Sequence, residues 1–455
     1  MHDIRLPLHL KLIYGLGDHS VNVALVALTM VFPFYLTEVV GMRIGLAGLV
    51  PLVGRSADAF SDVMVGRISD RTRWKAGRRR PYLLIGAIPF ALSFTAIWSI
   101  PEVENQSLEF AYYVAVYIAI SISMTIAAVP YQALLPELTE DYHERTSLAT
   151  FRSVSSLIGT LLTLVCFRPL VEWLGGDARA WSIGGAVLGL WILWPWLPIW
   201  WVTYERPSQQ VESNLSLRAY FGVLFQNRSF RRLLALFALG RIAIDLPMAL
   251  FLHFFTYVIG RPEVFEPIMA CFLVSTVLAM PLWLRFARSR DKATVYRYAC
   301  GGWVLTFFGF MLFQPDWPLW VMIVVACLSG AGYSAADMLP WSMVADVADE
   351  DELHSGERRE GLYVGVFTFM RKLAGAVGVA LAFAVLDVVG FEAGSDNSET
   401  VLWALRAMTA FVPALFVLIS AVAALGYTLG RDRHEEILVE LARRREIRRT
   451  AESDL

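Results

Sequence analysis

Apolar runs of membrane-spanning length dominate the sequence and recur along the whole of its 455 residues. The mean hydropathy is +0.53, and 56% of the residues are hydrophobic while only 18% are charged. A helix needs about 20 consecutive apolar residues to cross the hydrocarbon core of a bilayer. The pattern therefore predicts an all-α membrane protein and excludes an ordinary soluble domain. Twelve spans are expected, at residues 11–38, 44–68, 81–100, 109–134, 147–171, 178–203, 231–259, 264–286, 294–313, 318–345, 360–390 and 399–429.

A polar central segment, residues 204–230, divides the expected spans into two halves of six. The stretches "PYQALLPELTED" (130–141) and "PWSMVADVADED" (340–351) each close the fourth span of their half, and a Glu-Arg pair follows each of them. Transporters built from two six-helix bundles show such repeats, and their site lies between the bundles near mid-membrane. The expected parts are an N-terminal six-helix bundle at 1–203, a cytoplasmic central loop at 204–230, a C-terminal six-helix bundle at 231–430 and a basic cytoplasmic tail at 431–455.

Lysine and arginine gather in two of the connections between spans. Segment 67–80 holds seven of them and segment 285–297 holds five, whereas three connections on the other side hold none. The positive-inside rule then places both termini and the central loop in the cytoplasm. The tail at 431–455 either forms a short basic helix on the inner leaflet or, as we expect, is a solvated extension with no special partner. The three connections without basic residues are 101–109, 314–318 and 390–400.

Two aspartates interrupt the second expected span, where a lone carboxylate costs about 2.5–3.5 kcal/mol on insertion scales. Asp58 and Asp62 are one helical turn apart on the same face, where they repel each other unless a cation lies between them. The pair therefore indicates a site that exchanges Na⁺ or H⁺, with the hydroxyls of Ser61 and Thr125 completing a small oxygen cage. In the alternative, Arg55 neutralises Asp58 in a structural ion pair. Two acids against one base leave one charge unmatched, and this favours the cation site.

Other charges inside the expected spans also need partners. Lys372 lies deep in "VFTFMRKLAGAVGVALAF" without an acid in its own helix, so it pairs either with the second-span acids or with an anionic group of a substrate. Arg152 in the fifth span faces the same choice. Arg241 and Asp245 are four residues apart and are expected to satisfy each other. Asp18 and the adjacent histidine either take part in a site or lie in a solvated mouth at the cytoplasmic end of the first span.

Two aromatic residues follow helix-breaking prolines at the echoed positions. Tyr131 follows Pro130 and Trp341 follows Pro340, so both are candidates for a substrate pocket. The chain holds no HExxH, GxSxG or Walker motif, its seven histidines show no ligand spacing, and its four cysteines show no metal or redox spacing. An enzyme is therefore not expected. The alternatives to a coupled transporter are an uncoupled facilitator and a sensor.

Five stretches carry a resemblance to a known family: "YGLGD" (14–18), "ADAFSDVMVGRISDRTRW" (57–74), "MTIAAVPYQAL" (124–134), "ATFRS" (149–153) and "MVADVADEDELHSGERREGLYVGVFTFMRK" (343–372). Together they resemble the glycoside–pentoside–hexuronide:cation symporters of the major facilitator superfamily, over nearly the whole chain. The resemblance implies a twelve-helix major facilitator fold of two six-helix bundles. In the melibiose permeases of this family, two second-helix aspartates hold the coupling cation and contact the sugar. By resemblance, Asp58 and Asp62 take these roles, Ser61 and Thr125 belong to the cation site, Lys372 links cation and substrate, and Arg152 is the family's fifth-helix arginine.

The sequence departs from the melibiose permeases where they clamp sugar hydroxyls. Two acids of that clamp fall on Asn22 and Ala128, and a nearby tryptophan falls on Gln132. The stretches "VPYQAL" and "LPWSM" instead resemble the sodium-dependent lysophosphatidylcholine symporters of the same family. We therefore expect a cation-coupled symporter for a lysophospholipid-type amphiphile, with a Na⁺-coupled symporter of melibiose-type sugars or glycosides as the alternative.

The connection at 70–80 has two interpretations. Asp70, Arg71 and Arg78 form a cytoplasmic gate with neighbouring helix ends, or the basic run is only a topology signal. The expected coupling ion is Na⁺, with H⁺ as the alternative, and no other cofactor is expected. The expected partners are membrane lipid and a small-molecule or lysolipid substrate, without nucleic acid, and the protein is expected to be a monomer. In a bacterium it would be a multi-pass protein of the inner (plasma) membrane.

Overall fold

The expected spans all lie on helices. The structure is a computed structural model that describes residues 6–72, 74, 77–103, 105–139, 141–205, 227–356 and 359–453, and no strand occurs among them. Nine helical stretches of these residues are long and apolar enough to cross a membrane. The other three expected spans are α3 (Ile44–Arg71), α4 (Arg80–Ala96) and α12 (Lys292–Leu312). The prediction of an all-α membrane protein is thus confirmed.

The helices form two compact units. The first unit comprises Met1–Gln210, Met248–Tyr257 and Val379–Ala404. Besides α3 and α4 it contains α1 (Leu8–Val26), a π-helical turn (Ala27–Val31), α2 (Phe32–Glu38), α5 (Gln106–Leu138), α6 (Tyr142–Trp173), α7 (Ala178–Leu193) and α8 (Trp196–Val202).

The second unit comprises Val211–Pro247, Val258–Gly378 and Leu405–Leu455. Two of its helices, α10 and α14, therefore give their last turns to the first unit. The predicted central loop lies mostly in residues 206–226, outside the described residues, so the division of the chain at that loop stays a prediction. The helices of this unit besides α12 are α10 (Arg228–His253), α11 (Phe265–Ser289), α13 (Leu319–Ser355), α14 (Glu360–Val388), α16 (Val412–Leu425) and α17 (Arg431–Ser453), whereas most of α15 (Glu399–Arg406) belongs to the first unit.

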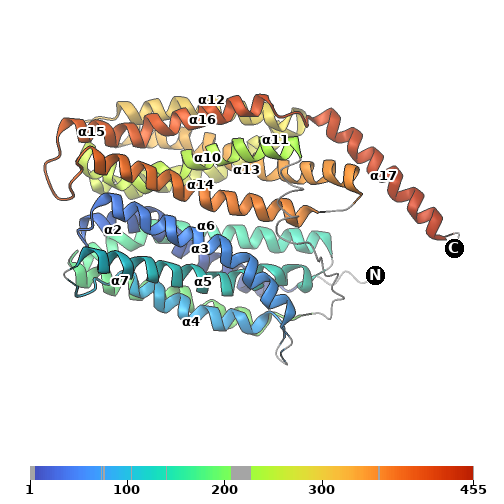
Figure 1. Ribbon diagram of the computed structural model, residues 1–455, viewed down its shortest axis with the longest axis horizontal. Coiled ribbons are helices and arrows are strands. Elements are labelled where there is room, and N and C mark those ends of the chain that lie inside the picture. Colours follow the sequence, from blue (N-terminus) through green and yellow to red (C-terminus); the bar gives the residue numbers. More distant parts are fainter. Residues whose placement is uncertain are drawn as a thin grey trace. The chain divides into compact units, whose positions relative to one another are not determined.

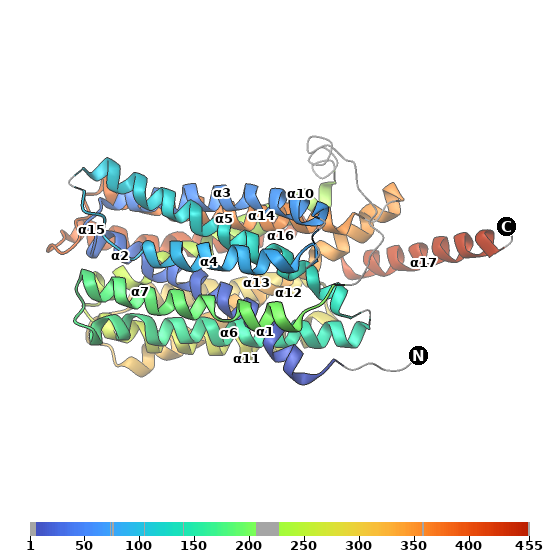
Figure 2. The same ribbon diagram turned by 90° about the horizontal axis from the view of Figure 1, so that it is seen from below.

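The same pattern of helix pairing occurs in both units. In the first, α5 packs against α3 and α4, and α4 packs against α7 (Figure 1). In the second, α13 packs against α11 and α12, and α12 packs against α16. Figure 2 also shows α1 beside α6, which is a close pair in the first unit. The repeated packing agrees with the echo between "PYQALLPELTED" and "PWSMVADVADED", because α5 and α13 are the helices that carry these stretches.

Side-chain caps fix where several helices of the first unit begin. Asn105 Oδ1 accepts a hydrogen bond from Ser107 N at 2.8 Å and starts α5. Asp141 and Asp177 accept from the backbone N–H three residues later, each at 2.8 Å, and start α6 and α7. Such caps satisfy N–H groups that a helix leaves unpaired at its N-terminus. The connections are therefore set by short polar signals between the apolar runs.

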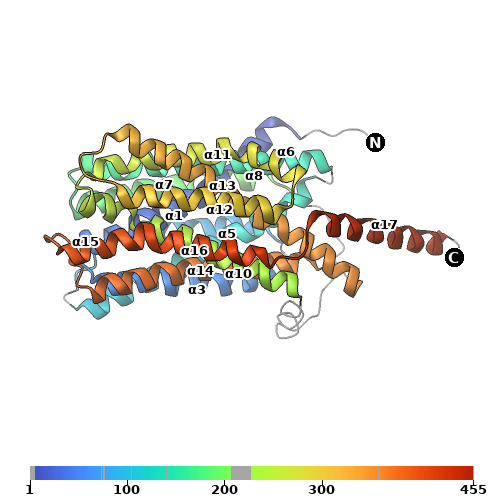
Figure 3. The ribbon, with the colours of Figure 1, turned by 90° about the horizontal axis from the view of Figure 1, so that it is seen from above.

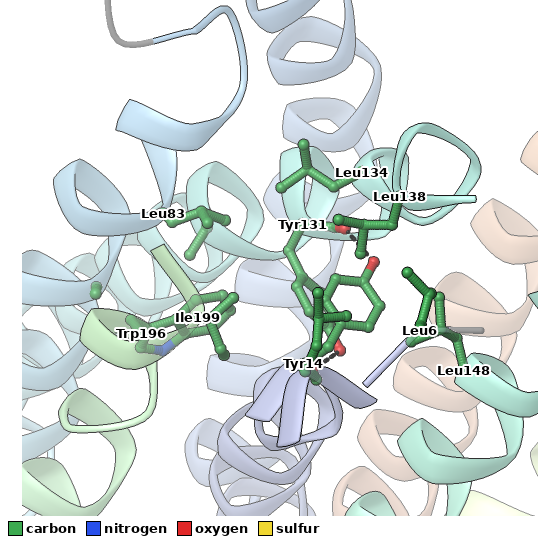
Figure 4. Close-up of a cluster of buried hydrophobic side chains, with 12 residues drawn as sticks. Leu6, Tyr14, Leu83, Tyr131, Leu134, Leu138, Leu148, Trp196 and Ile199 are labelled. Atoms are coloured by element: carbon green, nitrogen blue, oxygen red, sulfur yellow. Dashed lines mark hydrogen bonds between the residues drawn. The ribbon is translucent and has the colours of Figure 1, made fainter. Parts of the chain in front are cut away.

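A buried aromatic pair anchors α1 to α5 (Figure 4). The hydroxyl of Tyr14 donates to the carbonyl of Tyr131 at 2.8 Å, and the hydroxyl of Tyr131 donates to the carbonyl of Tyr14 at 2.6 Å. Gly17 permits this approach, because a Cβ there would lie 2.5 Å from Cζ of the Tyr131 ring. This reciprocal bonding satisfies the hydroxyls of both tyrosines and so sets the register of the two helices. Leu83, Leu134, Leu138, Leu148, Trp196 and Ile199 surround the pair.

The C-terminal helix α17 runs on beyond the end of α16 and packs its first half against α13 (Figure 3). Ile437 and Leu441 are buried on this face, while the neighbouring Val439 is exposed. His434 Nε2 lies 3.1 Å from Asp349 Oδ2, and the backbone N–H of Arg431 donates to Asp291 Oδ1 at 2.7 Å. The expectation of a solvated extension without a partner is wrong for this half, because apolar residues one helical turn apart give it a buried face.

Candidate cation and substrate site

The two aspartates of α3 meet the hydroxyl of one residue of α5. Thr125 Oγ1 lies 2.8 Å from Asp58 Oδ1 and 3.0 Å from Asp62 Oδ1. Ser61 Oγ lies 3.3 Å from the same Thr125 oxygen and donates to the backbone carbonyl of Asp58 at 2.9 Å. Asp58 and Thr125 are only 4% and 2% exposed. The structure thus brings together the four residues predicted for the cation site.

Proton counting shows what this arrangement favours. A threonine hydroxyl carries one proton, so Thr125 can donate to only one of the two carboxylate oxygens at a time. The contact between Thr125 Oγ1 and the carboxylate oxygen that receives no proton from it is favourable only when an added proton or metal ion supplies positive charge there. Carboxylate and hydroxyl oxygens are hard ligands, which suit a hard cation such as Na⁺.

The ligand set is also one of low charge. Within the described residues, no three His, Cys, Asp or Glu side chains gather as they would around a tightly held metal ion. Two carboxylates and two hydroxyls make a weaker oxygen site, because affinity rises with the number of charged ligands. Such a site suits an ion that binds and leaves in each cycle.

Arg55 Nη2 donates to Thr29 Oγ1 at 2.8 Å, one turn before Asp58 on α3. Thr29 belongs to the π-helical turn that follows α1. A π-helical turn widens a helix locally, and such turns are frequent at functional sites. This contact ties the α3 cluster to the first membrane span.

Arg152 of α6 has its partner in α1. Its Nε and Nη2 donate to the two carboxylate oxygens of Asp18 at 2.6 and 3.1 Å, which is a bidentate pair. The guanidinium also lies 5.1 Å from the centre of the Tyr131 ring, within the range of a cation–π contact. Asp18 is therefore an ion-pair partner rather than a group in a solvated mouth. The partner of Arg152 is therefore Asp18 of the first span, and not one of the second-span acids that the sequence suggested.

The neighbours of Asp18 have structural partners. Asn22 Nδ2 donates to the Asp18 carbonyl at 2.8 Å. His19 is buried, accepts from Trp191 Nε1 at Nε2 (2.8 Å) and bonds the Ser155 carbonyl through Nδ1 (3.2 Å). These two bonds fix a neutral ring with its proton on Nδ1.

The basic connection before α4 is held by two glutamates. Glu137 of α5 accepts from Arg78 Nη2 and, at 2.5 Å, from Arg79 Nη1. The Glu205 carboxylate accepts the backbone N–H groups of Arg78, Arg79 and Arg80 at 2.8, 2.9 and 2.8 Å. A carboxylate at a helix N-terminus is favoured both by these unpaired N–H groups and by the helix dipole.

A matching contact occurs in the second unit, where Lys292 Nζ lies 2.7 Å from both carboxylate oxygens of Asp346. Neither Glu137 nor Asp346 was predicted as a site residue. Each lies inside an echoed stretch, Glu137 in the first and Asp346 in the second, and each pairs with the basic connection of its own half. That shared arrangement was the signal available in the sequence. Of the predicted gate, Arg78 is placed by Glu137, while the side chains of Asp70 and Arg71 lie outside the described residues.

Comparison with known proteins identifies the family. A family model described as "MFS/sugar transport protein" matches residues 13–431. The chain belongs to this family. It is therefore a transporter of the major facilitator superfamily (MFS) and not an enzyme, and the sequence-based recognition is confirmed.

Three similar proteins show the range of the family. An uncharacterised symporter of Synechocystis is 29% identical, covering 96% of this chain and 97% of its own length. The sodium-dependent lysophosphatidylcholine symporter 1 of Gallus gallus is 25% identical, covering 95% of this chain and 88% of its own length. The crystal structure of the nucleoside transporter NupG shares the fold, with a TM-score of 0.64 at 16% identity over 92% of this chain and 98% of that one.

The remaining residues predicted for the substrate site of this MFS transporter are distributed over both units. Tyr131 is fully buried in the aromatic pair and contacts Arg152, while Gln132 beside it is exposed. Trp341 packs edge-on against two phenylalanines of the second unit. Lys372 is half-buried on α14 of the same unit. The roles of these residues in substrate binding and coupling stay predictions.

The second unit has a buried charge cluster of its own. Arg241 and Asp245 form the expected pair within α10, and Arg241 Nη1 also lies 3.3 Å from Asp337 Oδ1 of α13. Gly375 makes room for the Asp245 carboxylate, because a Cβ at this position would lie 1.7 Å from Asp245 Oδ2. The prediction that these two residues satisfy each other is confirmed, and the partner on α13 is an addition to it.

A second polar cluster of the first unit was not predicted. It joins the ends of α10 and α14 to those of α2 and α3. His253 Nε2 is 2.8 Å from Thr37 Oγ1, and Tyr257 donates to Glu38 Oε2 at 2.6 Å. Arg43 Nε donates to Asp387 Oδ1 at 2.6 Å. These contacts pair spans that are more than 200 residues apart, so spacing along the chain gave no signal for them.

Proposed function

We propose that this transporter is a cation-coupled secondary symporter working by alternating access, with Na⁺ as the coupling ion and H⁺ as the alternative. The observation that carries the proposal is the convergence of Asp58 Oδ1 and Asp62 Oδ1 on the single hydroxyl of Thr125. A site in which two acids share one hydroxyl proton gains most from one added cation. The sodium-dependent symporter of Gallus gallus lends support to Na⁺.

In this proposal Na⁺ is a transported substrate that binds to the oxygens of Asp58, Ser61, Asp62 and Thr125. Its binding relieves the repulsion between the carboxylates and draws α3 toward α5. A ligand that binds one conformation better shifts the population toward it by its difference in affinity. The favoured conformation is the one that accepts the organic substrate, and Lys372 is the proposed link between the two events.

For the organic substrate we propose a lysophospholipid-type amphiphile. Asn22 already donates to the Asp18 carbonyl, and Arg152 is already paired with the Asp18 carboxylate. Neither position offers the free acid with which a sugar hydroxyl would be clamped. The lysophosphatidylcholine symporter among the similar proteins agrees with this choice. The alternative is a sugar or glycoside, which the description of the family favours.

The contacts of Thr37, Glu38 and Arg43 belong to the transport cycle in this proposal. The positive-inside rule assigns the connections next to them to the outside of the cell and both termini to the cytoplasm. The hydrogen bonds to His253, Tyr257 and Asp387 then hold the outer end closed and must break before substrate enters.

Uptake into proteoliposomes tests the coupling site. We expect Asp58→Asn to lose Na⁺-driven uptake because it removes one of the two ligand charges. The matched control is Asp316→Asn, which makes the same change in an exposed connection and should transport normally. Full Na⁺-dependent uptake by Asp58→Asn would refute the mechanism.

Thermal stability measurements test the substrate. Lysophosphatidylcholine and melibiose are added separately, each with and without Na⁺. We expect stabilisation by lysophosphatidylcholine that is larger with Na⁺. Stabilisation by melibiose alone would replace the lysolipid by a sugar and leave the coupling site unchanged.

A further inference from the structure

The outer surface of the second unit contains an apolar groove of about 400 Å³ between α11, α12 and α13. Its walls include Trp283, Tyr298, Gly302, Leu305 and Leu328. Leu305 is 70% exposed and Leu328 is 59% exposed, so the groove opens outward on the side that faces lipid in a membrane-spanning protein. Glycine makes the space, because a Cβ added at Gly302 meets no atom within 4 Å.

The groove has the length of one bilayer leaflet. Along α12 it extends from Tyr298 to Gly309, and eleven residues of helix rise about 16 Å. The hydrocarbon core of a bilayer is about 30 Å thick, so this length is close to half of it. Trp283 and Tyr298 lie at one end of the groove, and such amphipathic aromatics prefer the level of the lipid headgroups. The groove therefore matches the length of one acyl chain whose carboxyl end lies beside Trp283 and Tyr298.

The aromatic end of the groove adjoins a cluster of arginines. Arg285, Arg288 and Arg290 follow Trp283 at the end of α11, and Arg297 precedes Tyr298 at the start of α12. The first three are exposed, and within the described residues no carboxylate forms an ion pair with any of the four. Arg297 donates to Thr294 Oγ1 but keeps a buried Nε without a partner. Unpaired guanidinium groups at headgroup level are complementary to phosphate.

We propose that this groove binds one acyl chain of an anionic phospholipid whose phosphate lies among these arginines. An apolar groove left empty would lose the dispersion contacts of its lining, and a lipid tail restores them. Tails alone give no selectivity, because bulk lipid is equally apolar. The arginines supply the preference for an anionic headgroup. The site does not depend on the proposed ion or substrate, since it holds a lipid rather than carrying it.

Native mass spectrometry of the full-length protein tests the groove with matched variants. Gly302→Trp fills it, while Gly301→Trp places the same ring on the preceding residue of α12, also in open space but outside the lining. With added phosphatidylglycerol, we expect Gly302→Trp to lose the tightest bound lipid and Gly301→Trp to keep it. Both should match the wild type in thermal unfolding, because tryptophan replaces a helical glycine. Equal lipid binding by the two variants would overturn the proposal.

The headgroup is tested separately with phosphatidylethanolamine of the same chains. Each arginine near the membrane surface contributes about 1 kcal/mol of attraction, so Arg285→Ala with Arg288→Ala should weaken phosphatidylglycerol binding about thirty-fold. Binding of phosphatidylethanolamine should hardly change. Equal affinity of the wild type for the two lipids refutes an anionic site. If the wild type is a dimer and Gly302→Trp is a monomer, the groove binds a second copy of the chain. If Gly302→Trp loses uptake, the groove belongs to the transport path. Either result overturns the proposal.

Discussion

Replacing Thr125 by valine removes the hydroxyl on which both carboxylates converge while keeping nearly the same side-chain volume. The hydroxyl is buried and lies 2.8 and 3.0 Å from the carboxylate oxygens of Asp58 and Asp62. A hydrogen bond or ligand contact to a charged group contributes about 1.5–3 kcal/mol. Loss of this oxygen should therefore weaken the binding of the coupling ion about ten- to a hundred-fold. Ser61→Ala should weaken it less, because Ser61 Oγ lies farther from the shared oxygen and also bonds backbone.

The measurement is a Na⁺ titration of the purified protein, followed by thermal unfolding and by Na⁺-dependent uptake in proteoliposomes. Thr125→Val should shift the half-saturating Na⁺ concentration upward in both experiments. At saturating Na⁺ the maximal uptake should recover in part, since the two carboxylates remain. If H⁺ is the coupling ion, the same variant should instead shift the pH dependence of uptake and leave no response to Na⁺.

Thr163→Val is the matched control. Thr163 is also fully buried, but its hydroxyl donates to the Gly159 carbonyl of its own helix at 3.0 Å and contacts no carboxylate that the structure describes. We expect normal Na⁺ dependence from it. The reasoning about the shared hydroxyl fails if a folded Thr125→Val protein titrates with Na⁺ like the wild type and like this control.

Three further predictions concern the contacts around the site. Arg152→Gln and Asp18→Asn should each lower the stability of the half-buried pair by about 2 kcal/mol in thermal unfolding, and the double variant should lose less than the sum; additive losses would show that the pair does not interact. Glu205→Gln should cost about 1–2 kcal/mol because a neutral amide caps α4 less well, and an unchanged unfolding temperature would contradict this role. Thr37→Val removes one bond to His253, worth about 1 kcal/mol, so backbone amide exchange in the loop that follows α2 should be about five-fold faster; an unaltered exchange rate would mean that this contact does not hold the end closed.

Sequence was most informative where structure follows from local geometry. The length of the apolar runs set the spans, and the spacing of four residues put Asp58 and Asp62 on one face of α3. Thr125, from another helix, was named through its likeness to a family motif together with chemical suitability. The structure supports that choice because α3 packs against α5.

Sequence was least informative where two distant helices meet. The pairing of Asp18 with Arg152 joins residues 134 positions apart, and no local periodicity says which buried acid faces which buried base. Glu205 caps α4 only because the chain returns there after α8. The docking of α17 was hidden for a different reason. Its many charges suggested a solvated segment, whereas its buried face is provided by Ile437 and Leu441.

The composition of the first unit has a consequence for biosynthesis. Its contacts at Thr37 and Arg43 need His253 and Asp387, which leave the ribosome long after the first six spans. At about 5–20 residues per second, the roughly 200 residues between positions 205 and 404 take about 10–40 s to translate. The early spans must wait in the membrane for that time without these contacts. A nascent chain stalled near residue 205 should therefore be a better client for membrane chaperones and quality-control proteases than one released after residue 404.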